Sequence, residues 1–140
     1  MNCDNIVKEQ LKKQLIKICE KYKVEYMSVF GSYGTENWKK GVSDIDIGII
    51  HKDIIDEYCF EEEIFPILKT YFNYEIINLT YLEKDINDFL YMNIICGETL
   101  FSKENPKELK YEVLDFYNDN GYYVELYTKL QLEKRRKYFG

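Results

Sequence analysis

Ser28-Val-Phe-Gly-Ser-Tyr-Gly-Thr-Glu-Asn-Trp-Lys-Lys-Gly-Val-Ser-Asp-Ile-Asp-Ile-Gly-Ile-Ile50 is the stretch of the chain that decides its fold. It predicts an apolar strand, a turn at Gly31-Ser32, a polar connection and a second strand that opens with Asp44-Ile-Asp46. Side chains two residues apart in a strand lie on the same face. The carboxylates of Asp44 and Asp46 are therefore expected side by side, with their backbones about 7 Å apart.

The turn before these carboxylates has the chemistry of a phosphate site. Gly31 has no Cβ, so a ligand can approach its backbone closely. The amides that follow can surround phosphate oxygens, and the Ser32 hydroxyl can donate to one of them. Paired carboxylates can hold Mg²⁺ together with a nucleoside triphosphate. A Gly-Ser turn alone is an ordinary feature, but the turn and the Asp-x-Asp pair in this order favour phosphoryl-group chemistry.

Helices and strands are expected to alternate around this segment. We expect helices over residues 4–22, 53–71, 85–96 and 105–137, the last divided at Gly121, and strands over 25–30, 43–50 and 74–79. A small extended piece is expected at Leu100-Phe101, and Pro66 should kink or interrupt the second helix. The second strand is almost continuous in isoleucine, which is typical of a strand covered on both faces. These elements predict an α+β (or α/β) fold with a small mixed sheet flanked by helices.

Length and composition predict one soluble globular domain. The chain has 140 residues, within the usual size of a single domain. Its residues are 46% hydrophobic and 31% charged, a composition typical of a soluble globular protein and not of a disordered chain. We expect a main unit over residues 1–103 and a helical C-terminal extension over residues 104–140, packed on the same domain.

Charge and cysteine content exclude several classes of function. The net charge of −6 argues against direct binding of nucleic acid, which depends on lysine and arginine contacts with phosphates. No secretory segment or membrane-length apolar run is evident, so we expect a cytoplasmic protein without a membrane partner. The four cysteines are scattered without a close pair, so we expect reduced thiols and no disulfide or zinc site.

The central segment resembles the signature of the nucleotidyltransferase superfamily related to DNA polymerase β. In that signature a Gly-Ser turn leads to an Asp-x-Asp strand, and a third acidic residue lies on a neighbouring strand. Phe30-Gly-Ser-Tyr and Ser43-Asp-Ile-Asp-Ile resemble most the minimal nucleotidyltransferases (MNT proteins), many of which are antitoxins of HEPN-domain ribonucleases. The resemblance implies a polymerase β-like nucleotidyltransferase fold with a helical C-terminal tail.

The resemblance also implies roles for particular residues. Asp44 and Asp46 would bind Mg²⁺ on the triphosphate, and Glu75 would be the third acidic residue, completing a second metal site and accepting the proton of the acceptor hydroxyl. Gly31, Ser32 and Ser43 would bind the nucleotide. The implied reaction is transfer of AMP from ATP to a tyrosine hydroxyl of a HEPN toxin, in a hetero-oligomer with that toxin.

Three departures from the signature leave alternatives open. The connection from Ser32 to Asp44 is one residue longer than the commonest form, an arginine often found in the turn is absent, and Glu75 replaces the usual aspartate. One alternative is a catalytically weak or inactive binding module that neutralises a HEPN partner by forming a complex. The other is a nucleotidyltransferase acting on a small molecule of the aminoglycoside kind.

Overall fold

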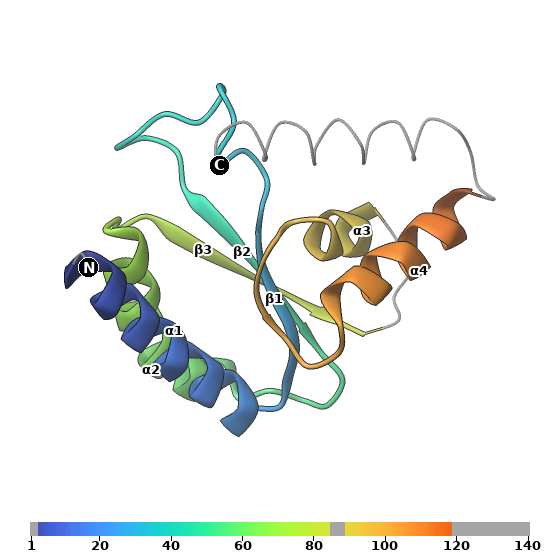
Figure 1. The fold of residues 1–140 in the computed structure, drawn as a ribbon, viewed down its shortest axis with the longest axis horizontal. Coiled ribbons are helices and arrows are strands. Elements are labelled where there is room, and N and C mark those ends of the chain that lie inside the picture. Colours follow the sequence, from blue (N-terminus) through green and yellow to red (C-terminus); the bar gives the residue numbers. More distant parts are fainter. Residues whose placement is uncertain (1–2, 85–88, 119–140) are drawn as a thin grey trace.

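The computed structural model describes residues 3–84 and 89–118 and forms a mixed sheet between two pairs of helices (Figure 1). In chain order its elements are α1 (Cys3–Lys21), β1 (Val24–Phe30), β2 (Ile45–His51), α2 (Glu57–Phe72), β3 (Ile77–Glu83), α3 (Phe89–Ile95), β4 (Glu98–Ser102) and α4 (Pro106–Asn118). The four-stranded sheet has the order β3-β2-β1-β4. β1 pairs antiparallel with β2 and β4, and β2 pairs parallel with β3. The predicted small mixed sheet flanked by helices is confirmed.

Helices α1 and α2 cover one face of the sheet. Figure 1 shows these two helices lying together on one side of the strands. Ile45, Ile47 and Ile49 of β2 are completely buried in this layer. They pack in one cluster with side chains of α1 and α2 that include Leu15 and Phe60. Each such buried apolar side chain contributes about 1.5–3 kcal/mol to folding, so this layer is the main core.

Helices α3 and α4 cover the other face. Tyr26 and Ile50 form a second buried cluster with residues of these helices, including Leu109 and Val113 of α4. Gly48 lets α3 approach β2 closely, because a Cβ at position 48 would lie only 2.5 Å from a side-chain carbon of Ile94. Because side chains alternate along a strand, Gly48 and Ile50 share their face with Asp46.

Two side chains of β1 fix the end of α3 over this face. The Ser28 hydroxyl donates to the carbonyl of Ile94 at 2.5 Å, and the Tyr26 hydroxyl donates to the carbonyl of Ile95 at 2.8 Å. Ser28 and Tyr26 are both almost completely buried. The last carbonyls of a helix have no partner within the helix, so these bonds satisfy them in the core.

Pro66 does not interrupt α2, contrary to one of the two expectations for that position. The helix runs without a break from Glu57 to Phe72, with Asp56 as its N-cap and Asn73 in left-handed conformation at its end. Proline removes one N–H from the helical ladder, and the carbonyl that loses this partner belongs to Glu62. Pro66 and Glu62 are both exposed, so water can bond to that carbonyl.

The third strand starts later and runs further than the sequence predicted. The expected strand covered residues 74–79, whereas β3 runs from Ile77 to Glu83. Its parallel pairing with β2 extends from Ile45 opposite Ile77 to His51 opposite Glu83. β3 therefore continues as far as β2 provides partners, and residues 74–76 lead into it.

The remaining elements follow the sequence closely. The expected start at Asn105-Pro106 is confirmed, because the Asn105 carboxamide accepts from the backbone N–H of Lys107 at 2.9 Å at the start of α4. α3 agrees with the expected helix over 85–96 within its described part, whereas residues 85–88 and the expected final helix beyond residue 118 lie outside the described residues. The expected boundary between residues 103 and 104 stays a prediction. Among the described residues, no helix combines the length and hydropathy needed to cross a membrane.

Candidate functional site

The Gly31 turn and the Asp46 carboxylate meet at one end of β1 and β2. Phe30, the last residue of β1, lies opposite Asp46 of β2, so the turn begins beside this carboxylate. A Cβ at position 31 would stand 2.6 Å from Asp46 Oδ2, and Gly31 has a φ of +75°. Both the close approach and the left-handed backbone require glycine. The structure thus brings together two of the residues that the sequence singled out.

Asp44 and Asp46 lie on either side of a buried isoleucine at the start of β2. Ile45 is completely buried beneath α1 and α2, while both aspartates are partly exposed. Asp46 belongs to the strand, and Asp44 immediately precedes it. The pair therefore stands where the chain enters the sheet, next to the turn that ends β1.

Asn78 is the neighbour of Asp46 on β3. The two residues are partners in the parallel register. The Asn78 carboxamide donates to Asp46 Oδ1 at 3.4 Å. An asparagine can donate or accept a hydrogen bond but carries no charge, so β3 contributes a neutral polar group at this point.

Glu75, expected as the third acidic residue, is not placed with the pair. It precedes β3, because that strand begins only at Ile77. Its side chain is 85% exposed and lies 3.7 Å from the Lys69 ammonium. Among the described residues, no three histidine, cysteine or acidic side chains gather closely enough to hold a metal ion.

The connection between the turn and Asp44 is folded on itself. The carbonyl of Ser32 accepts from the backbone N–H of Thr35 at 2.9 Å and from its hydroxyl at 2.5 Å. Further along, the N–H of Ser43 donates to the carbonyl of Lys39 at 2.8 Å, and the Ser43 hydroxyl accepts from the N–H of Lys39 at 3.0 Å. Ser43, expected as a nucleotide contact, thus uses its hydroxyl within the connection. The Ser32 side chain remains partly exposed.

The sequence patterns did not identify two residues of this site. Trp38 donates its indole N–H to the carbonyl of Asp44 at 2.8 Å, and Tyr74 donates its hydroxyl to the carbonyl of Ser43 at 2.5 Å. Trp38 is the only tryptophan of the chain and stands in an otherwise polar connection. That contrast was the available signal. Tyr74 carried none, because it looked like the first residue of a strand.

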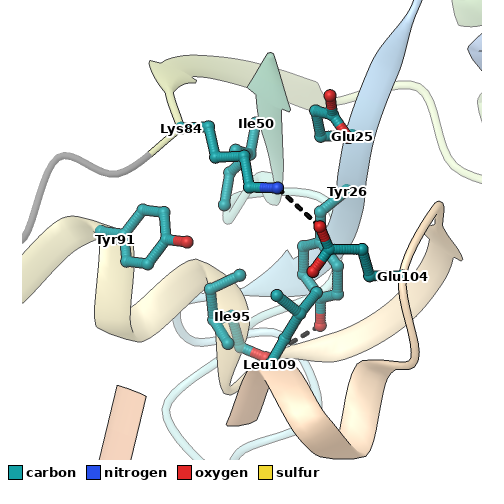
Figure 2. Close-up of a pocket in the computed structure, with 8 residues that line it drawn as sticks. All are labelled: Glu25, Tyr26, Ile50, Lys84, Tyr91, Ile95, Glu104 and Leu109. Atoms are coloured by element: carbon teal, nitrogen blue, oxygen red, sulfur yellow. Dashed lines mark hydrogen bonds and ion pairs between the residues drawn. The ribbon is translucent and has the colours of Figure 1, made fainter. Parts of the chain in front are cut away.

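Two hollows lie away from the carboxylate pair. One, shown in Figure 2, lies between the sheet and helices α3 and α4, with Tyr26, Ile50 and Leu109 among its lining residues. It is bordered by an ion pair in which Lys84 lies 2.8 Å from Glu104, and this contact lowers the pKa of Glu104. Tyr26 and Ile50 are four positions along β1 and β2 from the Phe30–Asp46 pair, or about 13 Å.

The second hollow, of about 340 Å³, is lined by residues that include Val29, Tyr33 and Leu100. Val29 and Leu100 belong to the cluster beneath α1 and α2, so this hollow lies on the face opposite Asp46. Neither hollow contains the two aspartates, and the candidate site is the exposed end of β1 and β2.

Comparison with known proteins places most of the chain in one family. Residues 13–106 match the family described as "Polymerase beta, Nucleotidyltransferase", a range that includes the turn and both aspartates. The curated proteins include no match.

Several solved structures are similar to the chain in part. A mutant of the toxin–antitoxin pair MntA-HpeT is 15% identical, with 78% of this chain and 88% of that chain covered and a TM-score of 0.47. A toxin–antitoxin with AMP-PNP is 17% identical over the same shares, also with a TM-score of 0.47. A tri-AMPylated Shewanella oneidensis HEPN toxin in complex with its MNT antitoxin gives 18% identity, 81% and 88% coverage and a TM-score of 0.46.

Proposed function

The chain belongs to the polymerase beta nucleotidyltransferase family, and we propose that it transfers AMP from ATP to a protein hydroxyl. The observation that carries the proposal is the contact between the Gly31 turn and Asp46. It joins a turn with the chemistry of a phosphate site to a carboxylate at one end of two neighbouring strands. The proposed reaction forms a bond from the acceptor oxygen to the α-phosphorus and releases pyrophosphate, while the hydroxyl proton passes to a base.

The donor atoms of Asp44 and Asp46 fit Mg²⁺. This ion prefers oxygen ligands and is commonly held by one or two carboxylates together with substrate phosphates and water. Two aspartates therefore suffice when the nucleotide supplies the remaining ligands. When bound, Mg²⁺ neutralises charge on the triphosphate and polarises the phosphoryl group.

The turn has the complementary role. The backbone amides after Gly31 and the Ser32 hydroxyl would hold the departing phosphates through hydrogen bonds. Ser43 would support the connection by accepting from Lys39, and its O–H would donate to the nucleotide. The Glu75 side chain would have to leave its ion pair with Lys69 to reach the metal.

The proposed acceptor is a tyrosine hydroxyl of a HEPN toxin, with which the chain forms a hetero-oligomer in the cytoplasm. The basis is the resemblance of Phe30-Gly-Ser-Tyr and Ser43-Asp-Ile-Asp-Ile to the minimal nucleotidyltransferases. A toxin of this kind would be neutralised by modification of the tyrosine.

One observation favours a second candidate function. The strand neighbour of Asp46 is the neutral Asn78, and no three-ligand cluster forms among the described residues. A site with fewer carboxylates would bind metal more weakly. The second candidate is therefore a binding module that neutralises the toxin by occupying it.

A transfer assay separates the two candidates. The chain is incubated with labelled ATP, Mg²⁺ and the product of the neighbouring gene as the candidate HEPN toxin, and label on that protein is measured together with residual ribonuclease activity. Transfer that disappears in the Asp44→Asn plus Asp46→Asn double variant supports the enzyme. Neutralisation that persists in the double variant, without transfer by either protein, supports the binding module.

A further inference from the structure

We propose that Trp38 and Tyr74 are positioning residues for the Asp44–Asp46 pair. The inference rests on the proposed metal role of these two aspartates. Asp44 lies at the edge of the sheet. The first paired residue of β2 is Ile45, so Asp44 lies just outside the strand ladder and needs another support.

Two aromatic side chains supply that support through the backbone. The indole N–H of Trp38 donates to the carbonyl of Asp44 at 2.8 Å. The Tyr74 hydroxyl donates to the carbonyl of Ser43 at 2.5 Å and accepts from the N–H of Gly41 at 2.8 Å. Both carbonyls in front of β2 are thus held by side chains from outside the strand.

The two aromatic residues also hold each other. Their ring centroids lie 5.0 Å apart, and the Trp38 ring lies at the same distance from the ring of Tyr33. Tyr33 in turn packs edge-on against Phe72 at the end of α2. Such aromatic pairs contribute beyond the area that they bury. The long connection between Ser32 and Asp44 is therefore attached to the helix layer through a chain of rings.

These contacts hold in place a connection that is one residue longer than the commonest form. An extra residue would allow the backbone at Asp44 to move, and a displacement of about 1 Å can cost a hundredfold in rate. Groups that orient metal ligands from outside are worth about 10- to 100-fold in metal affinity. We therefore assign to Trp38 and Tyr74 the task of keeping Asp44 in register with Asp46.

The test uses metal binding as its readout and needs no toxin. Because Trp38 is the only tryptophan and bonds to Asp44, its fluorescence should report metal binding at the pair. Mn²⁺ is titrated in the presence of a non-hydrolysable ATP analogue, and quenching of the emission is followed. Tyr74→Phe keeps the ring and removes both hydroxyl bonds, and it should weaken Mn²⁺ binding about 10-fold.

A matched control removes an equivalent bond elsewhere. The Tyr81 hydroxyl donates to Glu61 at 3.0 Å in the layer of α1 and α2, so Tyr81→Phe loses a tyrosine hydrogen bond of the same kind away from the site. It should bind Mn²⁺ like the natural chain. Trp38→Phe, followed by calorimetry because it removes the fluorophore, should weaken binding in the same direction as Tyr74→Phe. Circular dichroism checks that all variants are folded.

The outcomes separate this inference from the proposed function. Mn²⁺ should quench the emission of the natural chain but not that of the Asp44→Asn plus Asp46→Asn double variant. If it does not distinguish the two, the proposed metal site is wrong, and the positioning role is wrong with it. If the natural chain binds Mn²⁺ and Tyr74→Phe binds equally well, the positioning role is overturned while the proposed function stands. If Tyr74→Phe and Tyr81→Phe weaken binding equally, the effect is one of general stability and the positioning role is again overturned.

Discussion

Asn78 faces Asp46 across the parallel pairing of β2 and β3, with its carboxamide nitrogen 3.4 Å from Oδ1 of the aspartate. The pair places a neutral group where an additional charge would act on the metal ion proposed to bind at Asp46. The effect of that charge on metal binding can be measured with Asn78→Asp, because asparagine and aspartate have nearly the same shape.

Replacing this asparagine with a carboxylate should strengthen the metal site. Asn78→Asp adds a negative charge beside Asp46, so we expect lower stability without metal, through repulsion of like charges, and tighter Mg²⁺ binding. Thermal unfolding with and without Mg²⁺ and the ATP analogue measures both effects, since a bound ligand raises the unfolding temperature. Asn5→Asp adds the same charge at an exposed position of α1, outside the connection that holds Asp44, and serves as the control. A smaller Mg²⁺ stabilisation in Asn78→Asp than in the natural chain would contradict the expectation.

Gly31→Ala should damage the site through direct contact. The new Cβ would lie 2.6 Å from Asp46 Oδ2, at a φ of +75°. We expect the left-handed backbone to cost about 1–2 kcal/mol and the displaced carboxylate to lower the transfer rate about a hundredfold. Urea unfolding and the transfer assay measure the two effects.

Gly41→Ala provides the matched comparison for that variant. Gly41 has a φ of +83°, but nothing lies within 4 Å of an added Cβ. The two variants share the backbone strain. Gly41 also donates its N–H to the Tyr74 hydroxyl, so Gly41→Ala includes any loss that passes through this bond. A rate loss in Gly31→Ala no larger than that in Gly41→Ala would contradict a catalytic effect of the contact with Asp46.

Glu75→Gln should have little effect. The side chain is 85% exposed and its ion pair with Lys69 spans 3.7 Å, a kind of surface pair worth about 0–1 kcal/mol. We expect nearly unchanged unfolding in urea and a transfer rate within about threefold of the natural chain, the scatter expected of a surface substitution. A rate loss comparable to that of Asp46→Asn would show instead that Glu75 reaches the metal in the working complex.

Stability should fall in acid because of a contact between α1 and α2. The Glu63 carboxylate accepts a short hydrogen bond from the Tyr22 hydroxyl and lies 3.0 Å from the Lys21 ammonium. These contacts hold the pKa of Glu63 below its ordinary value and raise the pKa of Tyr22 to about 12. Because the pKa of Glu63 is lower in the folded protein than in the unfolded chain, its contacts stabilise the fold fully at pH values above the unfolded-state pKa, near 4.5. This stabilisation is lost as the pH falls through the pKa of Glu63 in the folded protein.

The measurement is the unfolding temperature between neutral pH and about pH 3, where carboxylates titrate. Glu63→Gln should lower that temperature at neutral pH and flatten its decline in acid. Glu83→Gln, at the exposed end of β3, is the comparison. An acid decline in Glu63→Gln as steep as in the natural chain would rule out this contact as its source.

The turn and the strand after it could be predicted because their patterns are local. Gly31-Ser32 breaks an apolar run, and the isoleucines after Asp44 have the composition of a buried strand. The start of β3 could not be predicted in this way, because Tyr74 and Ile76 fit a strand as well as Ile77 does. Only the pairing with β2 decides the register, and that pairing is a tertiary contact. The expectation for Glu75 depended on that register.

The hydrogen bonds of Trp38 and Tyr74 could not be predicted from local sequence patterns either. Their acceptors are backbone carbonyls, which every residue possesses, so no side-chain pattern marks Ser43 or Asp44 as a partner. Tyr74 is also 31 positions from the carbonyl that it holds. Contacts of this kind become visible only when the two ends of the segment are placed in space.

The antiparallel pairing of β1 and β2 makes the candidate site a property of one hairpin. These are two consecutive strands joined by their own connection (Figure 1). The turn and Asp44 lie in that connection, and Asp46 lies on β2. A chain cut between β4 and α4 would still carry the turn, both aspartates and Tyr74 on one continuous piece. Circular permutation at that junction should therefore preserve the contact of the turn with the carboxylates.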